Sequence, residues 1–168
     1  NELTELQGSI GYALATLASS VALLTINKNK RKRVNVWLFS TFITSLLALD
    51  VQTSFRFTIK NHLSEWATNF GLYSQRHTTQ ALVLIFLLLL VIASTYSLRF
   101  KITPPEFKLM LFGLGSALFW FALSIVSHHA IDRIIYSPIG HVYLICWLWN
   151  ISAFCIISGS LITTKKLL

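Results

Sequence analysis

The residues of this chain with the greatest capacity for chemistry are its five histidines and the charged groups near them. The densest group is the run 127–133, in which two adjacent imidazoles are followed by Asp132 and Arg133. On a continuous helix, His128 and His129 precede Asp132 by four and three residues, so either imidazole can reach the carboxylate within one turn. Such a partner fixes the tautomer of a histidine and raises its basicity. The run therefore favours either polar capping of a helix end or a ligand site.

A metal or haem site at this place needs ligands from other parts of the chain. His77 and His141 stand at the starts of two hydrophobic segments, at the right depth to join His128 and His129. A haem instead requires two of these histidines on facing helices. Because the spacing matches no specific metal motif, three interpretations stay open: capping of helix ends, ligation of a metal ion or haem, and proton-coupled or quinol chemistry. The cofactor is unknown, and the sequence requires none.

A second set of polar residues is expected beside the histidines. Asp50 is the only carboxylate inside a predicted span, and Ser54 lies one turn further on. Ionisable groups in a membrane are costly and often functional. We expect Asp50 to form an ion pair with Arg76 or Arg133 that pins two spans together, and a proton or ligand contact is the alternative. Gln80, one turn after Arg76, belongs to the same set.

The composition of the chain indicates the kind of structure that positions these residues. Of its 168 residues, 54% are hydrophobic and only 12% are charged, whereas soluble domains carry about 25% charged residues. A hydrocarbon core is crossed by roughly 20 apolar residues in a helix. The sequence therefore predicts an all-α membrane helix bundle, a single integral membrane domain with five spans at residues 10–26, 34–55, 79–98, 109–127 and 142–163.

The basic residues predict the orientation of this bundle. Ten Lys and Arg residues fall on one side of the predicted spans, whereas only Arg56, Lys60, Arg76 and Arg133 fall on the other. By the positive-inside rule, the N-terminus lies outside and the C-terminus is cytoplasmic. All five histidines then lie outside. The net charge of +8 is interpreted as this topology signal with some contact to anionic lipids, and no nucleic-acid partner is expected.

An amphipathic helix is expected outside the membrane between the second and third spans. Apolar residues recur there at helical spacing, opposite a face with Lys60 and Asn61: Ile59, Leu63, Trp66 and Phe70. This pattern is typical of a helix that lies along a membrane surface, and Gly71 is expected to end it. It is interpreted as a lid or an anchor.

Small residues predict where the spans pack. A stripe in the fourth span contains Gly113, Ala117 and Ser124, and the fifth span has a comparable line through Ser152 and Gly159. Helices in lipid associate largely where small residues let their backbones approach. We therefore expect helix seams at both stripes.

Three short motifs lie at the ends of these spans: residues 49–53 (LDVQT), residues 73–76 (YSQR) with Gln80, and residues 127–132 (SHHAID). Over roughly residues 46–150, the chain resembles a group of small, uncharacterised, five-span inner-membrane proteins of bacteria. That group has a second arginine beside the position of Arg76 and a carboxylate near that of Asn150, where this chain has His77 and Asn150. The resemblance implies the five-span fold and a bacterial inner membrane, and it implies no activity.

Three classes of function follow from these features. The favoured one is a non-catalytic accessory or structural subunit of a larger membrane complex, with the lipid bilayer and other membrane subunits as partners, because the loops are short and no soluble domain is predicted. The second is a redox protein that binds a metal, haem or quinol at the outer histidines. The third is a small transporter or channel lined by Asp50, Arg76 and Asn150. No catalytic residue is identified.

Overall fold

The computed structural model describes residues 2–26, 31–71, 104–126 and 129–166, together with residues 78, 80, 82, 85, 86 and 89; for residues 31–33 and 129–130 it describes the backbone. The helices are α1 (Glu2–Thr25), α2 (Arg31–Thr53), α3 (Phe55–Asn69), α5 (Pro105–Val126), α6 (His129–Ile135) and α7 (Leu144–Lys165). A hairpin of two short antiparallel strands, β1 (Pro138–Ile139) and β2 (Val142–Tyr143), precedes α7.

Four of these helices are long and apolar enough to cross a membrane: Glu2–Thr25, Val34–Thr53, Pro105–Val126 and Leu144–Lys165. The all-α class and four of the expected membrane helices are therefore confirmed. Most of the remaining expected span, the third at residues 79–98, lies outside the described residues. The first helix begins at Glu2 rather than at residue 10, because its polar first turns are helical as well. Glu2 and Glu5 there lie favourably at the positive end of the helix dipole.

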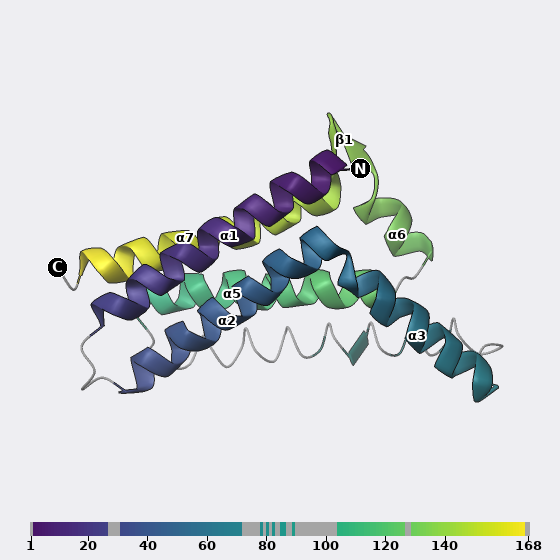
Figure 1. The fold of residues 1–168 in the computed structure, drawn as a ribbon, viewed down its shortest axis with the longest axis horizontal. Helices are drawn as coiled ribbons and strands as arrows, with labels where there is room; N and C mark the ends of the chain where they lie inside the picture. The colour runs from purple at the N-terminus through teal and green to yellow at the C-terminus, as the bar shows by residue number, and fades with distance from the viewer. Residues whose placement is uncertain are drawn as a thin grey trace.

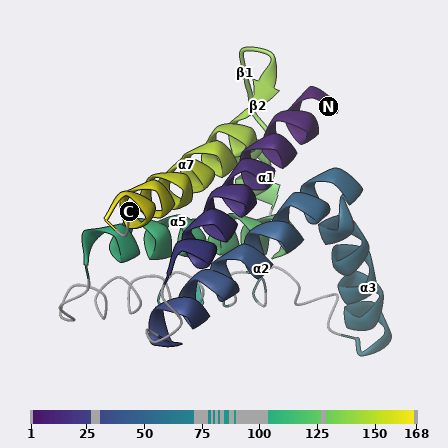
Figure 2. The ribbon, with the colours of Figure 1, turned by 60° about the vertical axis from the view of Figure 1, so that its left-hand side comes forward.

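The four long helices form one bundle, in which α1 and α7 run in one direction and α2 and α5 run in the other (Figures 1 and 2). Helix α1 packs between α2 and α7, and α5 packs along α7. The N-terminus, the α2–α3 junction, α6 and the hairpin lie at one end of the bundle, here called the N-terminal end (Figure 1). The C-terminus and the beginnings of α2 and α5 lie at the other, here called the C-terminal end. This arrangement brings Asp50, near the end of α2, beside the start of α1.

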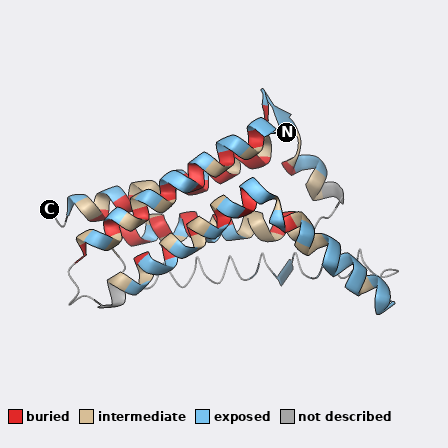
Figure 3. Cartoon of the chain, in the orientation of Figure 1, coloured by how far each residue is buried: buried red, intermediate tan, exposed pale blue. Residues whose placement is uncertain are grey.

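The buried positions lie on the sides where the helices face one another (Figure 3). Many of them carry small or hydroxylated residues, whereas many exposed positions carry large apolar ones. Ala15, Ser19 and Thr44 are fully buried, whereas Leu24 and Phe154 are 83% and 70% exposed. In water such a surface favours aggregation, but in lipid it is the expected one, since helices there associate through small residues and polar contacts.

Hydroxyl groups link the helices across these packing surfaces. Thr16 donates a hydrogen bond to Thr44 at 3.0 Å, which joins α1 to α2. On the same surface, the hydroxyl oxygens of Ser19 and Ser40 are 3.2 Å apart. Because the helix backbone satisfies its own hydrogen bonds, these side-chain contacts supply polar attraction between helices in lipid.

The contact between α5 and α7 depends on two glycines. A Cβ atom on Gly113 would lie 2.6 Å from the carbonyl oxygen of Ser152, and one on Gly159 would lie 2.6 Å from that of Glu106. Ala117 and Ser124 are buried on the same helix as Gly113. The glycines of the two stripes and Ser152 therefore lie inside this chain, in the contact between α5 and α7.

Candidate functional site

The polar centre of the N-terminal end is a buried ion pair between Asp50 and Arg56. Nη1 of Arg56 lies 3.1 Å from Oδ2 of Asp50, and the backbone N–H of Arg56 donates to Oδ1 at 2.6 Å. Arg56 is 2% exposed and Asp50 is 6% exposed. An ion pair removed from solvent in this way keeps its charges only while both partners are present.

The partner that the structure shows for Asp50 is Arg56, which was not among the expected partners Arg76 and Arg133. Arg133 is exposed on α6, and Arg76 lies outside the described residues. The partner is Arg56 because α2 ends at Thr53 instead of continuing to residue 55. On an unbroken helix, residues six apart point in different directions, so the break is what allows Arg56 to return to Asp50.

A single residue, Ser54, makes this break. It has φ 55° and ψ 31°, in the left-handed region that non-glycine residues seldom adopt. Its hydroxyl donates to a carboxylate oxygen of Glu5 at 3.1 Å, which ties the junction to α1. Asp50 meanwhile accepts the backbone N–H of Arg56, one of the free donors at the start of α3. These two contacts stabilise the strained turn.

Aromatic rings enclose the guanidinium group of Arg56. Its carbon Cζ lies 4.9 Å from the ring centroid of Phe57 and 4.9 Å from that of Trp149 on α7. Gly8 on α1 leaves room for the indole, since a Cβ there would lie 2.5 Å from Trp149. The ion pair thus joins α2, α3 and α7, and α1 packs over it. Arg56 was not predicted as a site residue because a basic residue directly after a span is usually expected to be exposed to solvent. Trp149 was not predicted because a tryptophan within a span is usually expected to face lipid.

Asn150 is the residue after Trp149 on α7. Its Nδ2 donates to the carbonyl oxygen of Cys146 at 2.8 Å, within the same helix. Its Oδ1 faces α1, where a Cβ on Gly11 would lie 2.6 Å from it. Cys146 in turn lies 3.7 Å from Oε1 of Gln7. These polar contacts hold α1 close to α7 over its first turns.

The expected histidine site is only partly within the described residues. His77 and His128 lie outside them, and the backbone of His129 begins α6. His141 is exposed after the turn residue Gly140 of the hairpin, and His62 is exposed on α3, 3.7 Å from Glu65. Within the described ranges, no three His, Cys, Asp or Glu side chains lie close enough to hold a metal ion. The structure therefore leaves ligation by His77, His128, His129 and His141 untested.

Asp132 and Arg133 lie in α6, where Asp132 is half-buried and Arg133 is exposed. Gln80, which was expected beside Arg76, donates from Nε2 to the carbonyl oxygen of Val126 at 3.0 Å. Val126 is the last residue of α5, so this bond satisfies one of the free carbonyls at a helix end. The polar residues predicted from sequence are thus distributed over separate contacts at the N-terminal end.

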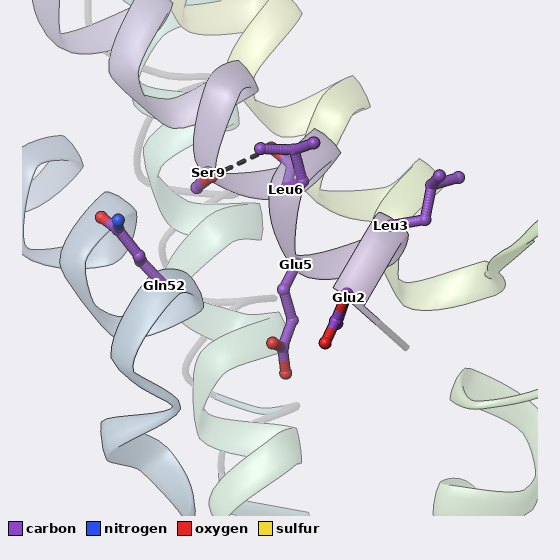
Figure 4. A pocket seen from close by; sticks show the side chains of 6 residues that line it. All are labelled: Glu2, Leu3, Glu5, Leu6, Ser9 and Gln52. Carbon is purple, nitrogen blue, oxygen red and sulfur yellow. Dashed lines mark hydrogen bonds between the residues drawn. The ribbon is translucent and has the colours of Figure 1, made fainter.

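A shallow depression on the surface of this end is lined by Glu2, Leu3, Glu5, Leu6, Ser9 and Gln52. Figure 4 shows the side chain of Gln52 on α2 across from those of α1, with the carboxylates of Glu2 and Glu5 at the same edge. The Glu5 carboxylate also accepts the hydrogen bond from the Ser54 hydroxyl. This contact makes one wall of the depression part of the α2–α3 junction.

The strain at Ser54 gives a testable prediction. Ser54→Ala removes the bond to Glu5 and keeps a Cβ at a positive φ, so we expect a loss of about 1 kcal/mol of stability from the lost hydrogen bond. Ser54→Gly also loses the bond but relieves a left-handed strain of about 1–2 kcal/mol. Ser54→Gly is therefore expected to be the more stable variant when unfolding equilibria are compared in mixed detergent micelles. Equal stability of the two variants would contradict the strained turn.

Together these features define a small all-α membrane-type helix bundle that is closed at one end by a buried ion pair. No family model, curated protein or solved structure matches the chain. Its function is therefore argued from its own residues.

Proposed function

We propose that this protein is a non-catalytic accessory subunit of a larger complex in a bacterial inner membrane. Its N-terminus lies outside and its C-terminus is cytoplasmic, as the excess of Lys and Arg on one side of the spans favours. Helix α3 lies along the outer surface of the membrane and serves as an anchor.

The accessory role is inferred from the distribution of side chains between the helix contacts and the outward surfaces. The small residues and hydroxyls are used between its own helices, as in the pair of Ser116 and Ser152 at 2.8 Å. The outward surfaces keep large side chains, among them Phe42 at 58%, Trp147 at 51% and Phe154 at 70% exposed. Aromatic residues are enriched at protein interfaces. These surfaces suit contact with lipid and with a neighbouring membrane protein.

The amphipathic character of α3 supports its place at the membrane surface. Leu63, Trp66 and Phe70 are 51%, 55% and 65% exposed, and they share one helix face. The rings of Trp66 and Phe70 lie 4.7 Å apart between centroids. Since only Ser54 separates the end of α2 from the start of α3, α3 begins at the depth where a spanning helix leaves the hydrocarbon. A helix with one aromatic face and one polar face is stable at that depth.

Purification from the native membrane in a mild detergent tests the accessory role. We expect other membrane proteins to co-migrate with this chain in a constant ratio. A monomer that carries only lipid would contradict the proposal. A visible spectrum and elemental analysis of the same preparation address the alternative, since a Soret band or a stoichiometric metal would instead favour the cofactor-binding function.

Spin labels test the position of α3 in lipid vesicles. In a background with Cys146 and Cys155 replaced by serine, single cysteines are introduced as Leu63→Cys and, on the opposite face, Asn61→Cys. We expect the label at residue 63 to be relaxed more by oxygen, which concentrates in lipid, and the label at residue 61 more by a water-soluble nickel complex. The same relaxation at both positions would show that α3 does not lie on the membrane.

A further inference from the structure

Two buried hydrogen-bond donors near the Asp50–Arg56 ion pair have no acceptor among the described residues. They are the hydroxyl of Tyr12 and the Nε–H of Arg56. Tyr12 is 1% exposed and Arg56 is 2% exposed, so bulk solvent does not reach either residue. Buried polar groups in folded proteins are nearly always bonded to protein atoms or to an ordered water. Each of these donors therefore requires an acceptor beyond the described protein atoms.

Both donors belong to the surroundings of the same ion pair. The Nε–H is part of the guanidinium group whose Nη1 contacts Asp50. Tyr12 follows Gly8 by one turn of α1, and a Cβ on Gly8 would meet both Val51, the residue after Asp50, and Trp149, whose ring centroid lies 4.9 Å from Cζ of Arg56. Oδ1 of Asp50 accepts the backbone N–H of Arg56, and Oδ2 accepts Nη1. A carboxylate has about four lone-pair sites, so each oxygen has capacity for a further hydrogen bond. The junction thus presents two donors and one acceptor.

We propose that a water molecule is bound at this junction, where it accepts hydrogen bonds from Tyr12 and Arg56 and donates one to Asp50. The charge on the arginine is already balanced by Asp50, so the ligand is neutral. A small molecule with two lone pairs and two protons matches the groups present, and buried waters typically make about three such bonds. The bound water links Tyr12 on α1 to the ion pair between α2 and α3, and it makes the closed end of the bundle a single hydrogen-bonded unit.

Solid-state NMR of the isotope-labelled protein in lipid bilayers tests this site directly. We expect magnetisation to pass from water protons to the Nε–H of Arg56, assigned through its own side-chain carbons. The substitution Tyr12→Phe should slow this transfer, because the water loses one of its bonds. A matched control is Tyr136→Phe, which deletes another buried hydroxyl that has no acceptor among the described residues. It should leave the transfer to Arg56 unchanged.

Unfolding equilibria of the same variants supply a second readout. If the hydroxyl of Tyr12 binds water, Tyr12→Phe should raise the unfolding constant about fivefold, the effect of one lost hydrogen bond. If the hydroxyl has no partner, its removal from an apolar site leaves the unfolding constant unchanged or lowers it. The proposal is overturned by either that result or a lack of transfer from water to Arg56, and it is supported when both expected results are obtained.

Discussion

Arg56→Met is expected to destabilise the protein by about 3–5 kcal/mol, the usual effect of removing one partner from a buried ion pair. The substitution keeps an apolar side chain against Trp149 but leaves the Asp50 carboxylate buried without its counter-ion. It also removes the side-chain link that holds α3 to α2. The measurement is the free energy of unfolding in mixed detergent micelles, with proteolysis within α3 as a local readout.

The matched control is Arg133→Met. Arg133 is exposed on α6, and substitutions of exposed residues usually change stability by less than about 0.5 kcal/mol. If Arg133→Met were as destabilising as Arg56→Met, the buried pairing of Asp50 would be wrong. The double variant Asp50→Leu with Arg56→Met should recover much of the lost stability, because no buried charge then lacks a partner.

The second large effect is expected at the contact between α5 and α7. Gly113→Ala places a methyl group 2.6 Å from the carbonyl oxygen of Ser152, so the helices must move apart. We expect a loss of about 1–3 kcal/mol, the typical cost of overpacking. Thermal unfolding of the purified protein in one fixed detergent measures this loss.

Gly115 on the same helix provides the control, because a Cβ there meets nothing within 4 Å. Gly115→Ala should be neutral or stabilising by roughly 0.5–1 kcal/mol, since alanine is the better helix former. A larger loss for Gly115→Ala than for Gly113→Ala would show that helix propensity rather than helix contact decides the outcome.

The sequence predicted the membrane helices well because length and apolar composition alone determine that property. The run 109–127 and the run 142–163 correspond closely to α5 and α7. The sequence did not predict which helices pack against each other. The stripe through Gly113 predicts a close contact, but only the fold shows that α7 of the same chain fills it.

The sequence predicted where the polar site lies but not which residue pairs with Asp50, because it did not predict the helix break before Arg56. Asp50 was singled out correctly as a polar residue near the end of a span, but a helix continuing to residue 55 makes a contact with Arg56 unreachable. The break occurs at Ser54, a residue that gives none of the usual signals of a left-handed turn, for which glycine and asparagine are favoured. Tertiary contacts with Glu5 and Asp50 stabilise the turn, and those contacts do not appear in local sequence.

The two glycine contacts between α5 and α7 also limit how this protein can move. Gly113 meets Ser152 and Gly159 meets Glu106, so the antiparallel pair is fixed at two separate levels along its length. Sliding one helix by a full turn, about 5.4 Å, would bring a side chain with a Cβ against each of these carbonyls. A piston motion of α7 is therefore blocked. A movement of the pair that keeps both contacts is a tilt or rotation of α5 and α7 as one rigid body.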